Sequence, residues 1–218
     1  MDSQGYKIFS FILFLSMSFF HLFSLMGNNS IRKGVSKALL MPSLLFSYVV
    51  LVPFASPFIV GALGLSFFGD VGLFIADKKP GVSQKVSILA FALSHILYTL
   101  YIFPQEAPFL LIFFPFLGTS IILALFYIKI LHPMGHTLTP LIFIYALIIT
   151  IMATSSFIFL LTYQTIASLV IFSGALFFLF SDFLIAKQII YNNKKYELAV
   201  MSTYIVAQFL LIIGFVLI

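Results

Sequence analysis

Long apolar runs, separated by short connections, constrain the fold of this chain more than any other feature of its sequence. A helix that crosses a membrane needs about 20 mostly apolar residues. We expect membrane spans at 7–26, 37–53, 57–76, 84–103, 107–130, 138–161, 165–190 and 197–217. The runs are continuous rather than alternating, which excludes a transmembrane β-barrel. The sequence therefore predicts an all-α, polytopic transmembrane helical bundle, with residues 1–218 as a single integral membrane domain.

Composition excludes most other classes of protein. Hydrophobic residues make up 62% of the chain and charged residues 8%, whereas about 25% of residues are charged in a soluble domain. The chain has no cysteine, so disulfides, zinc–thiolate sites and thiol nucleophiles are excluded. The net charge of +5 does not indicate a nucleic-acid partner, because the basic residues lie in short connections between apolar runs.

The basic residues also predict an orientation. Ten of them fall at the odd-numbered connections between spans and one, Lys7, on the other side. The ten are Arg32, Lys33, Lys37, Lys78, Lys79, Lys85, Lys129, Lys187, Lys194 and Lys195. By the positive-inside rule, we expect the odd connections in the cytoplasm and both termini outside. The membrane that we expect is the cell membrane, such as a bacterial inner membrane.

The third and seventh spans resemble one another. Gly69-Asp70 and Ser181-Asp182 each place a small residue before an aspartate. An apolar turn follows in both spans, and then a lysine at the expected cytoplasmic edge, Lys78 or Lys187. The similarity favours a parallel four-plus-four repeat. Because few residues are identical between the two halves, an ancient duplication and a chance likeness both stay open.

Asp70 and Asp182 are the two acids that lie inside spans, roughly 10 Å below the cytoplasmic surface at 1.5 Å per residue. A charged aspartate in hydrocarbon costs at least about 3 kcal/mol. Each acid must therefore face an interior cavity, pair with a partner or stay protonated. Around Asp70, the helical wheel gathers Gly61, Gly64, Gly69 and Gly72 on one face, and Leu63, Ser66, Phe67 and Phe74 on the acid's own side. This pattern predicts a cavity-lining helix, and a structural acid bonded to a neighbouring helix is the alternative.

A few other polar residues also lie inside or beside the predicted spans. His95 and Tyr98 share a helix face, as do Tyr204 and Gln208, and for both pairs ordinary interhelical hydrogen bonding is the alternative to a functional role. Lys37 could extend to the cytoplasmic surface instead of entering a site. His132 and His136 lie in a connection without a nearby acid, so we expect no metal site.

Taken in order, these motifs resemble the YhhN-type lysoplasmalogenase family. They are Gly69-Asp70-x-x-Leu73, Ser94-His95-x-x-Tyr98-x-x-Tyr101, Leu179-Phe180-Ser181-Asp182 and Tyr204-x-x-Ala207-Gln208. The resemblance runs from about Lys37 to Ile213. One departure is that the family usually has a lysine close to a proline at the start of the second helix. Here Met41-Pro42 occupies that place, and Lys37 lies one turn earlier.

The resemblance implies cleavage of the vinyl ether bond of lysoplasmalogens, giving a fatty aldehyde and glycerophosphoethanolamine or glycerophosphocholine. Such ethers hydrolyse through an oxocarbenium ion, which calls for a protonated acid and a second carboxylate, as in glycosidases. Asp70 and Asp182 are the expected catalytic pair, without a cofactor. The expected substrate-binding residues are Lys37 for the phosphate, and His95, Tyr98, Tyr204 and Gln208 for water and the glycerol oxygens. The 29 phenylalanines would line a slot for the alkenyl chain.

Three alternatives stay open. A small-molecule or lipid transporter could use the aspartates as a proton relay. A lipid-binding or sensor protein could keep the same fold without turnover. An enzyme of this type could also act on a related ether lysolipid. The expected partners are a lysophospholipid with an alkenyl chain and membrane lipid, and the sequence leaves the oligomeric state open.

Overall fold

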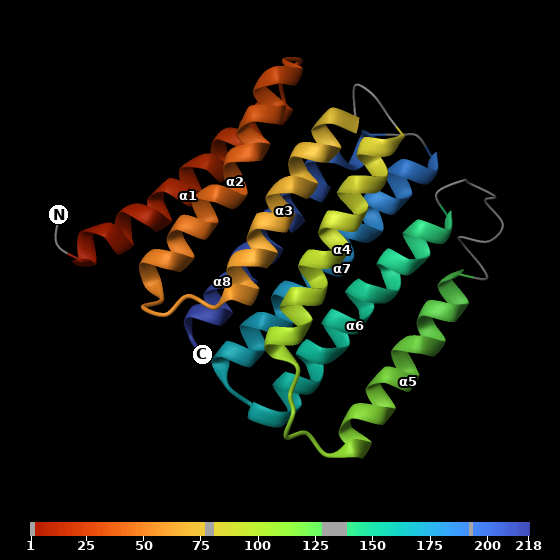
Figure 1. Cartoon of the computed structure of the whole chain (residues 1–218). Coiled ribbons are helices and arrows are strands. Elements are labelled where there is room, and N and C mark those ends of the chain that lie inside the picture. Colours follow the sequence, from red (N-terminus) through yellow and green to blue (C-terminus); the bar gives the residue numbers. More distant parts are fainter. Residues whose placement is uncertain (1–2, 77–80, 128–138, 192–193) are drawn as a thin grey trace. The chain divides into compact units, whose positions relative to one another are not determined.

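The computed structural model describes residues 3–76, 81–127, 139–191 and 194–218. These residues form eight α-helices and one short 3-10 helix, and they contain no strand (Figure 1). The α-helices are α1 (Ser3–Leu25), α2 (Ser30–Leu51), α3 (Pro57–Ala76), α4 (Val82–Ile102), α5 (Phe109–Phe126), α6 (Thr139–Tyr163), α7 (Ile166–Tyr191) and α8 (Glu197–Val216), and the 3-10 helix η3 is Lys194–Tyr196. The prediction of an all-α bundle is confirmed.

Seven of these helices are long and apolar enough to cross a membrane, and α5 is apolar over the shorter stretch Phe109–Leu125. Large apolar side chains are exposed along the helices, such as Phe19 of α1 at 73% and Ile122 of α5 at 68%. In water, this much exposed apolar area would be strongly unfavourable, whereas lipid tails cover it without cost. The chain is a multi-pass integral membrane protein.

Helix α2 begins before the apolar span that starts at residue 37. The Asn29 side chain accepts a hydrogen bond of 3.0 Å from the backbone N–H of Arg32, and so caps the first turn. Arg32 and Lys33 therefore belong to the helix rather than to a connection. The helix continues through Pro42, which a membrane helix tolerates when its neighbours satisfy the carbonyl that the proline leaves unbonded.

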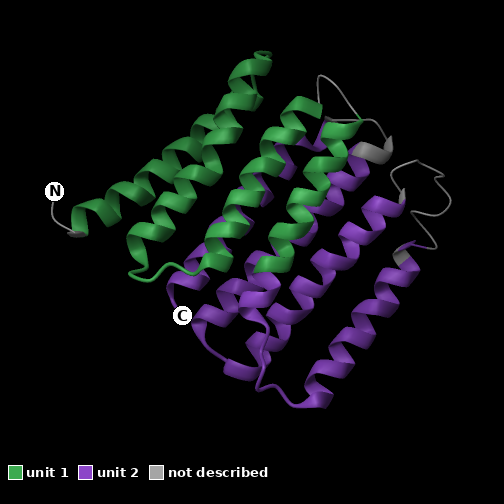
Figure 2. Cartoon of the chain, viewed as in Figure 1, with its two compact units in different colours: residues 1–97 green, residues 98–218 purple. Residues whose placement is uncertain are grey.

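The chain divides into two compact units, Met1–Leu97 and Tyr98–Ile218, and the boundary falls within α4 (Figure 2). The boundary lies near the point where a four-plus-four repeat would divide the chain. A single domain and an ancient duplication both stay predictions. Several residues that the sequence singled out lie outside the described part of the chain: Asp77, Lys78, Lys79, Lys129, His132 and His136.

In the first unit, small residues let the helices approach closely. Three of the four glycines of α3 face α4, where an added Cβ would meet Leu97 (at Gly61), Phe91 (at Gly69) and Ser87 (at Gly72). Nothing lies within 4 Å of a Cβ added at Gly64. On the other side of α3, the ring of Phe74 packs directly on Gly34 of α2. The predicted glycine face therefore packs against the following helix at three of its four positions.

In the second unit, α7 and α8 make the closest approach. A Cβ at Gly174 of α7 would lie 2.9 Å from the backbone nitrogen of Leu211. A Cβ at Gly214 of α8 would meet the side chain and backbone of Ile171. The Ser181 hydroxyl donates a hydrogen bond of 3.1 Å to the carbonyl of Val200 in α8. These contacts fix the part of α7 that carries Asp182.

Candidate functional site

Asp70 of α3 forms an ion pair with Lys37 of α2 inside the first unit. The distance between Lys37 Nζ and Asp70 Oδ1 is 3.3 Å. The Asp70 side chain is 1% exposed and that of Lys37 is 18% exposed. Because a lone charge at this depth is strongly unfavourable, each group compensates the charge of the other. Lys37 does more than extend to the surface, and its proposed contact with a phosphate stays a prediction.

Close packing holds this ion pair in place. Gly34 lies one turn before Lys37 on α2, and Phe74 lies one turn after Asp70 on α3. The ring of Phe74 occupies the space that a side chain at position 34 would need. A glycine at that position lets α2 and α3 come close enough for the lysine to reach the carboxylate.

The face of α3 that we expected to line a cavity is divided between two neighbouring helices. Asp70 and Phe74 contact α2, as described above. Ser66 lies 2.9 Å from Ser94 of α4, and Ser94 donates to the carbonyl of Ala62 at 2.8 Å. Ser66 thus belongs to the packing of α3 on α4.

Asp182 of α7 has a partner that the sequence did not predict, Tyr145 of α6. The Tyr145 hydroxyl donates a hydrogen bond of 2.6 Å to Asp182 Oδ2, and both residues belong to the second unit. One sequence signal could have found Tyr145. Most tyrosines lie near span ends, as expected for an aromatic belt, but Tyr145, like Tyr204, lies well inside an apolar run.

The remaining predicted site residues are buried. Tyr98, at the end of α4, donates a hydrogen bond of 2.9 Å to Gln208 Oε1 of α8. The ring of Tyr204 packs edge-on against Phe178 of α7, with 5.5 Å between the ring centroids. Phe178 lies one turn before Asp182, so Tyr204 packs beside the part of α7 that carries the acid. His95 is fully buried in α4, one turn before Tyr98.

Among the predicted site residues, Lys37 thus forms an ion pair with Asp70, and Tyr98 forms a hydrogen bond with Gln208. Asp70 belongs to the first unit and Asp182 to the second, so the pairing of the two acids stays a prediction. Within the described residues, no group of three or more histidines and acids could hold a metal ion.

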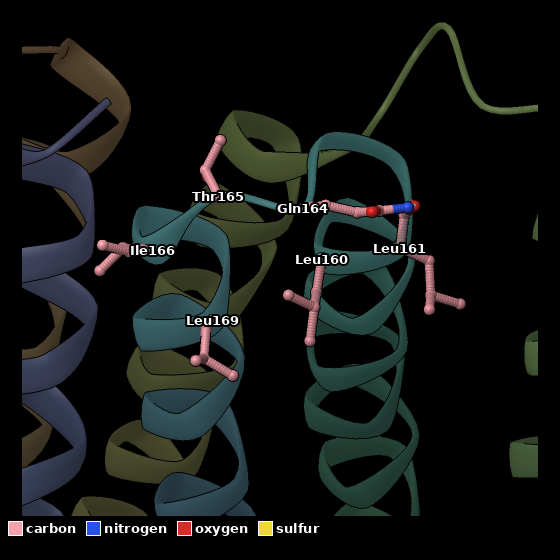
Figure 3. Close-up of a pocket in the computed structure, with 6 residues that line it drawn as sticks. All are labelled: Leu160, Leu161, Gln164, Thr165, Ile166 and Leu169. Carbon is pink, nitrogen blue, oxygen red and sulfur yellow. The ribbon is translucent and has the colours of Figure 1, made fainter.

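A groove of about 320 Å³ lies where α6 meets α7 (Figure 3). It is lined by Leu160, Leu161, Gln164, Thr165, Ile166 and Leu169. None of these is a predicted site residue. Leu169 and Asp182 are on the same helix, separated by roughly 20 Å at 1.5 Å per residue. The groove is therefore distinct from the surroundings of Asp182.

The chain is thus a multi-pass membrane protein that carries an aspartate inside each of two separate helices. Within this class, the model of the YhhN family matches residues 32–215, and the chain belongs to that family. The match begins in α2 and ends in α8, so it leaves out α1. The resemblance inferred from the motifs is confirmed. No curated protein and no solved structure matches the chain.

Proposed function

We propose that this protein is an intramembrane hydrolase that cleaves the vinyl ether bond of lysoplasmalogen to a fatty aldehyde and a glycerophospho-alcohol. The observation that carries the proposal is the pair of contrasting acid environments. Asp70 contacts a lysine ammonium and Asp182 contacts a tyrosine hydroxyl. Hydrolysis of a vinyl ether needs a proton donor and a carboxylate, and these environments suit the two tasks. Membership of the YhhN family supports the same reaction class.

The membrane setting supports the choice of substrate. A lysolipid presents its alkenyl chain to the bilayer and its head group to the water interface. The acids lie within apolar helices, below the end at which the basic residues gather. We propose that Lys37 binds the phosphate of the head group, and that His95, Tyr98, Tyr204 and Gln208 position water and the glycerol oxygens. The orientation with odd connections in the cytoplasm of a cell membrane belongs to the same proposal.

Aldehyde release from a 1-alkenyl lysolipid by the detergent-purified protein tests the reaction. The 1-alkyl analogue, which lacks the double bond, is the substrate control. Asp70→Asn and Asp182→Asn will each reduce turnover by at least about 100-fold, the range for loss of a general acid or base. Glu106→Gln, which neutralises an exposed acid, will keep full turnover. Absence of aldehyde from every vinyl-ether lysolipid, with folded protein, would contradict the proposal, and uptake into liposomes would then test the transporter.

Whether both acids act on one substrate can be tested separately. Because the chain has no cysteine, the double variant Asp70→Cys/Asp182→Cys contains the only two thiols. A short bifunctional thiol reagent will link them in membranes, and mass spectrometry of the digested protein will identify the linked peptides. The control pair Glu106→Cys/Asp182→Cys will not be linked. Failure of the first pair to react with short reagents, while each thiol reacts singly, would rule out a shared site.

A further inference from the structure

We infer that the two acids have fixed and different roles: Asp182 carries the catalytic proton, Tyr145 positions that proton, and Asp70 is the ionised carboxylate. The inference rests on the proposed function and goes beyond it, because it assigns a role to each acid. It also adds Tyr145 to the residues of the site.

Asp70 is the acid that stays ionised. Its Oδ1 lies 3.3 Å from the ammonium of Lys37, and both side chains are largely removed from solvent. A proton on Asp70 would leave the lysine charge without compensation at this depth, which is strongly unfavourable. The Phe74–Gly34 contact holds the two helices close together, so the lysine has little room to withdraw. Lys37 acts as a positioning residue that keeps Asp70 negative.

The catalytic proton therefore belongs to Asp182, since the reaction needs one protonated and one ionised carboxyl group. Tyr145 determines which oxygen carries it. The tyrosine donates a hydrogen bond to Asp182 Oδ2. In a protonated carboxyl group the carbonyl oxygen is the better acceptor, so this contact favours Oδ2 as the carbonyl oxygen and Oδ1 as the oxygen that carries the proton. On this assignment, Oδ1–H is the group that gives its proton to the substrate.

The roles give a balanced reaction. The Oδ1–H bond of Asp182 breaks and its proton adds to the vinyl carbon furthest from the ether oxygen, using the π electrons of the double bond. The charge moves to the oxygen-bonded carbon as an oxocarbenium ion. Water adds to this carbon and gives a proton to Asp70, forming a hemiacetal. Asp182 then takes the hemiacetal hydroxyl proton as the aldehyde forms, the bond to the glycerol oxygen breaks, and Asp70 returns its proton to that oxygen.

Infrared spectroscopy of the purified protein, without substrate, locates the proton independently of turnover. We expect the C=O stretch of a protonated carboxyl group at neutral pH, absent in Asp182→Asn and retained in Asp70→Asn and Glu106→Gln. A band that disappears in Asp70→Asn instead, or no band in the wild type, would overturn the assignment. If the band behaves as expected but no vinyl ether is cleaved, the proposed function fails and the location of the proton stands.

Tyr145→Phe tests the positioning role and keeps the aromatic ring. The carboxyl band will move to higher frequency, because the C=O group loses its hydrogen bond. The kcat will fall about 10-fold, the equivalent of one hydrogen bond, with KM nearly unchanged. Tyr163→Phe is the matched control on the same helix, since its side chain is 42% exposed, and it will change neither quantity. If the carboxyl band does not shift and kcat is unchanged in Tyr145→Phe, then Tyr145 does not position the proton of Asp182.

Discussion

The two units place an aspartate in the same local arrangement. In the first unit, Asp70 on α3 contacts the preceding helix α2, and Gly69 contacts the following helix α4. In the second unit, Asp182 on α7 contacts the preceding helix α6, and Ser181 contacts the following helix α8. The correspondence extends the likeness that the sequence shows between the third and seventh spans, and it favours the hypothesis of a repeat.

The difference between the units lies in the partner of each acid. Asp70 meets a cation, whereas Asp182 meets a neutral hydroxyl. If the roles proposed for the two acids hold, one arrangement of helices keeps one carboxylate negative and leaves the other able to carry a proton. On the proposed assignment, the residue on the preceding helix, rather than the aspartate motif itself, decides which role each acid takes.

Among the variants proposed, we expect Lys37→Met to reduce stability most. It removes the cation that contacts Asp70 in the first unit. It leaves the Asp70 charge buried without its cation, which costs about 3–5 kcal/mol. Thermal unfolding followed by circular dichroism measures the loss, since the chain has no tryptophan. Lys85→Met, which removes an exposed lysine of α4, is the matched control and will have little effect.

The double variant Lys37→Met/Asp70→Asn provides the decisive check on that loss. It removes both charges and will recover most of the stability, because the penalty of Lys37→Met comes from the charge left behind. Additive losses in the double variant would show that Lys37 stabilises the fold through packing alone, and that the ion pair does not determine the state of Asp70.

Glycine substitutions compare how closely the helices pack in the two units. In Gly174→Ala, the new methyl group meets the backbone of Leu211 at 2.9 Å, and backbone cannot move aside. We expect a loss of about 1–3 kcal/mol from overpacking. In Gly64→Ala, the methyl group meets nothing within 4 Å, and the better helix propensity of alanine will stabilise α3 by up to about 1 kcal/mol. Equal effects in thermal unfolding would mean that α7 and α8 approach less closely than described.

The fold could be predicted because hydrophobicity and length together identify a membrane helix. The start of α2 was harder, since Asn29 caps the helix outside the apolar run and only its hydrogen bond to Arg32 reveals the first turn. The glycine face of α3 also followed from helical periodicity. Periodicity does not say which neighbour a face meets, so the division of the opposite face between α2 and α4 could not be foreseen.

The candidate site was predictable for its acids and less so for their partners. Asp70 and Asp182 attract attention because charge inside hydrocarbon is unfavourable. Lys37 was identified, but its contact with Asp70 depends on the approach of α2 to α3 at Gly34, which is a tertiary property. Tyr145 carries no charge and lies on a different helix from Asp182. Its contact with Asp182 therefore becomes visible only when α6 packs beside α7.

The smallest expected change in stability comes from Tyr145→Phe, and it tests the contrast between the units most directly. Loss of one hydrogen bond to a neutral carboxyl group costs about 1 kcal/mol. The loss of stability in Lys37→Met should be several times larger, because that variant leaves the Asp70 charge buried without a partner cation. Thermal unfolding of both variants, beside Tyr163→Phe, measures the ratio. If Tyr145→Phe destabilises the protein as strongly as Lys37→Met, then Asp182 is itself an anion that depends on the tyrosine, the two acids are alike, and the division of roles between them is wrong.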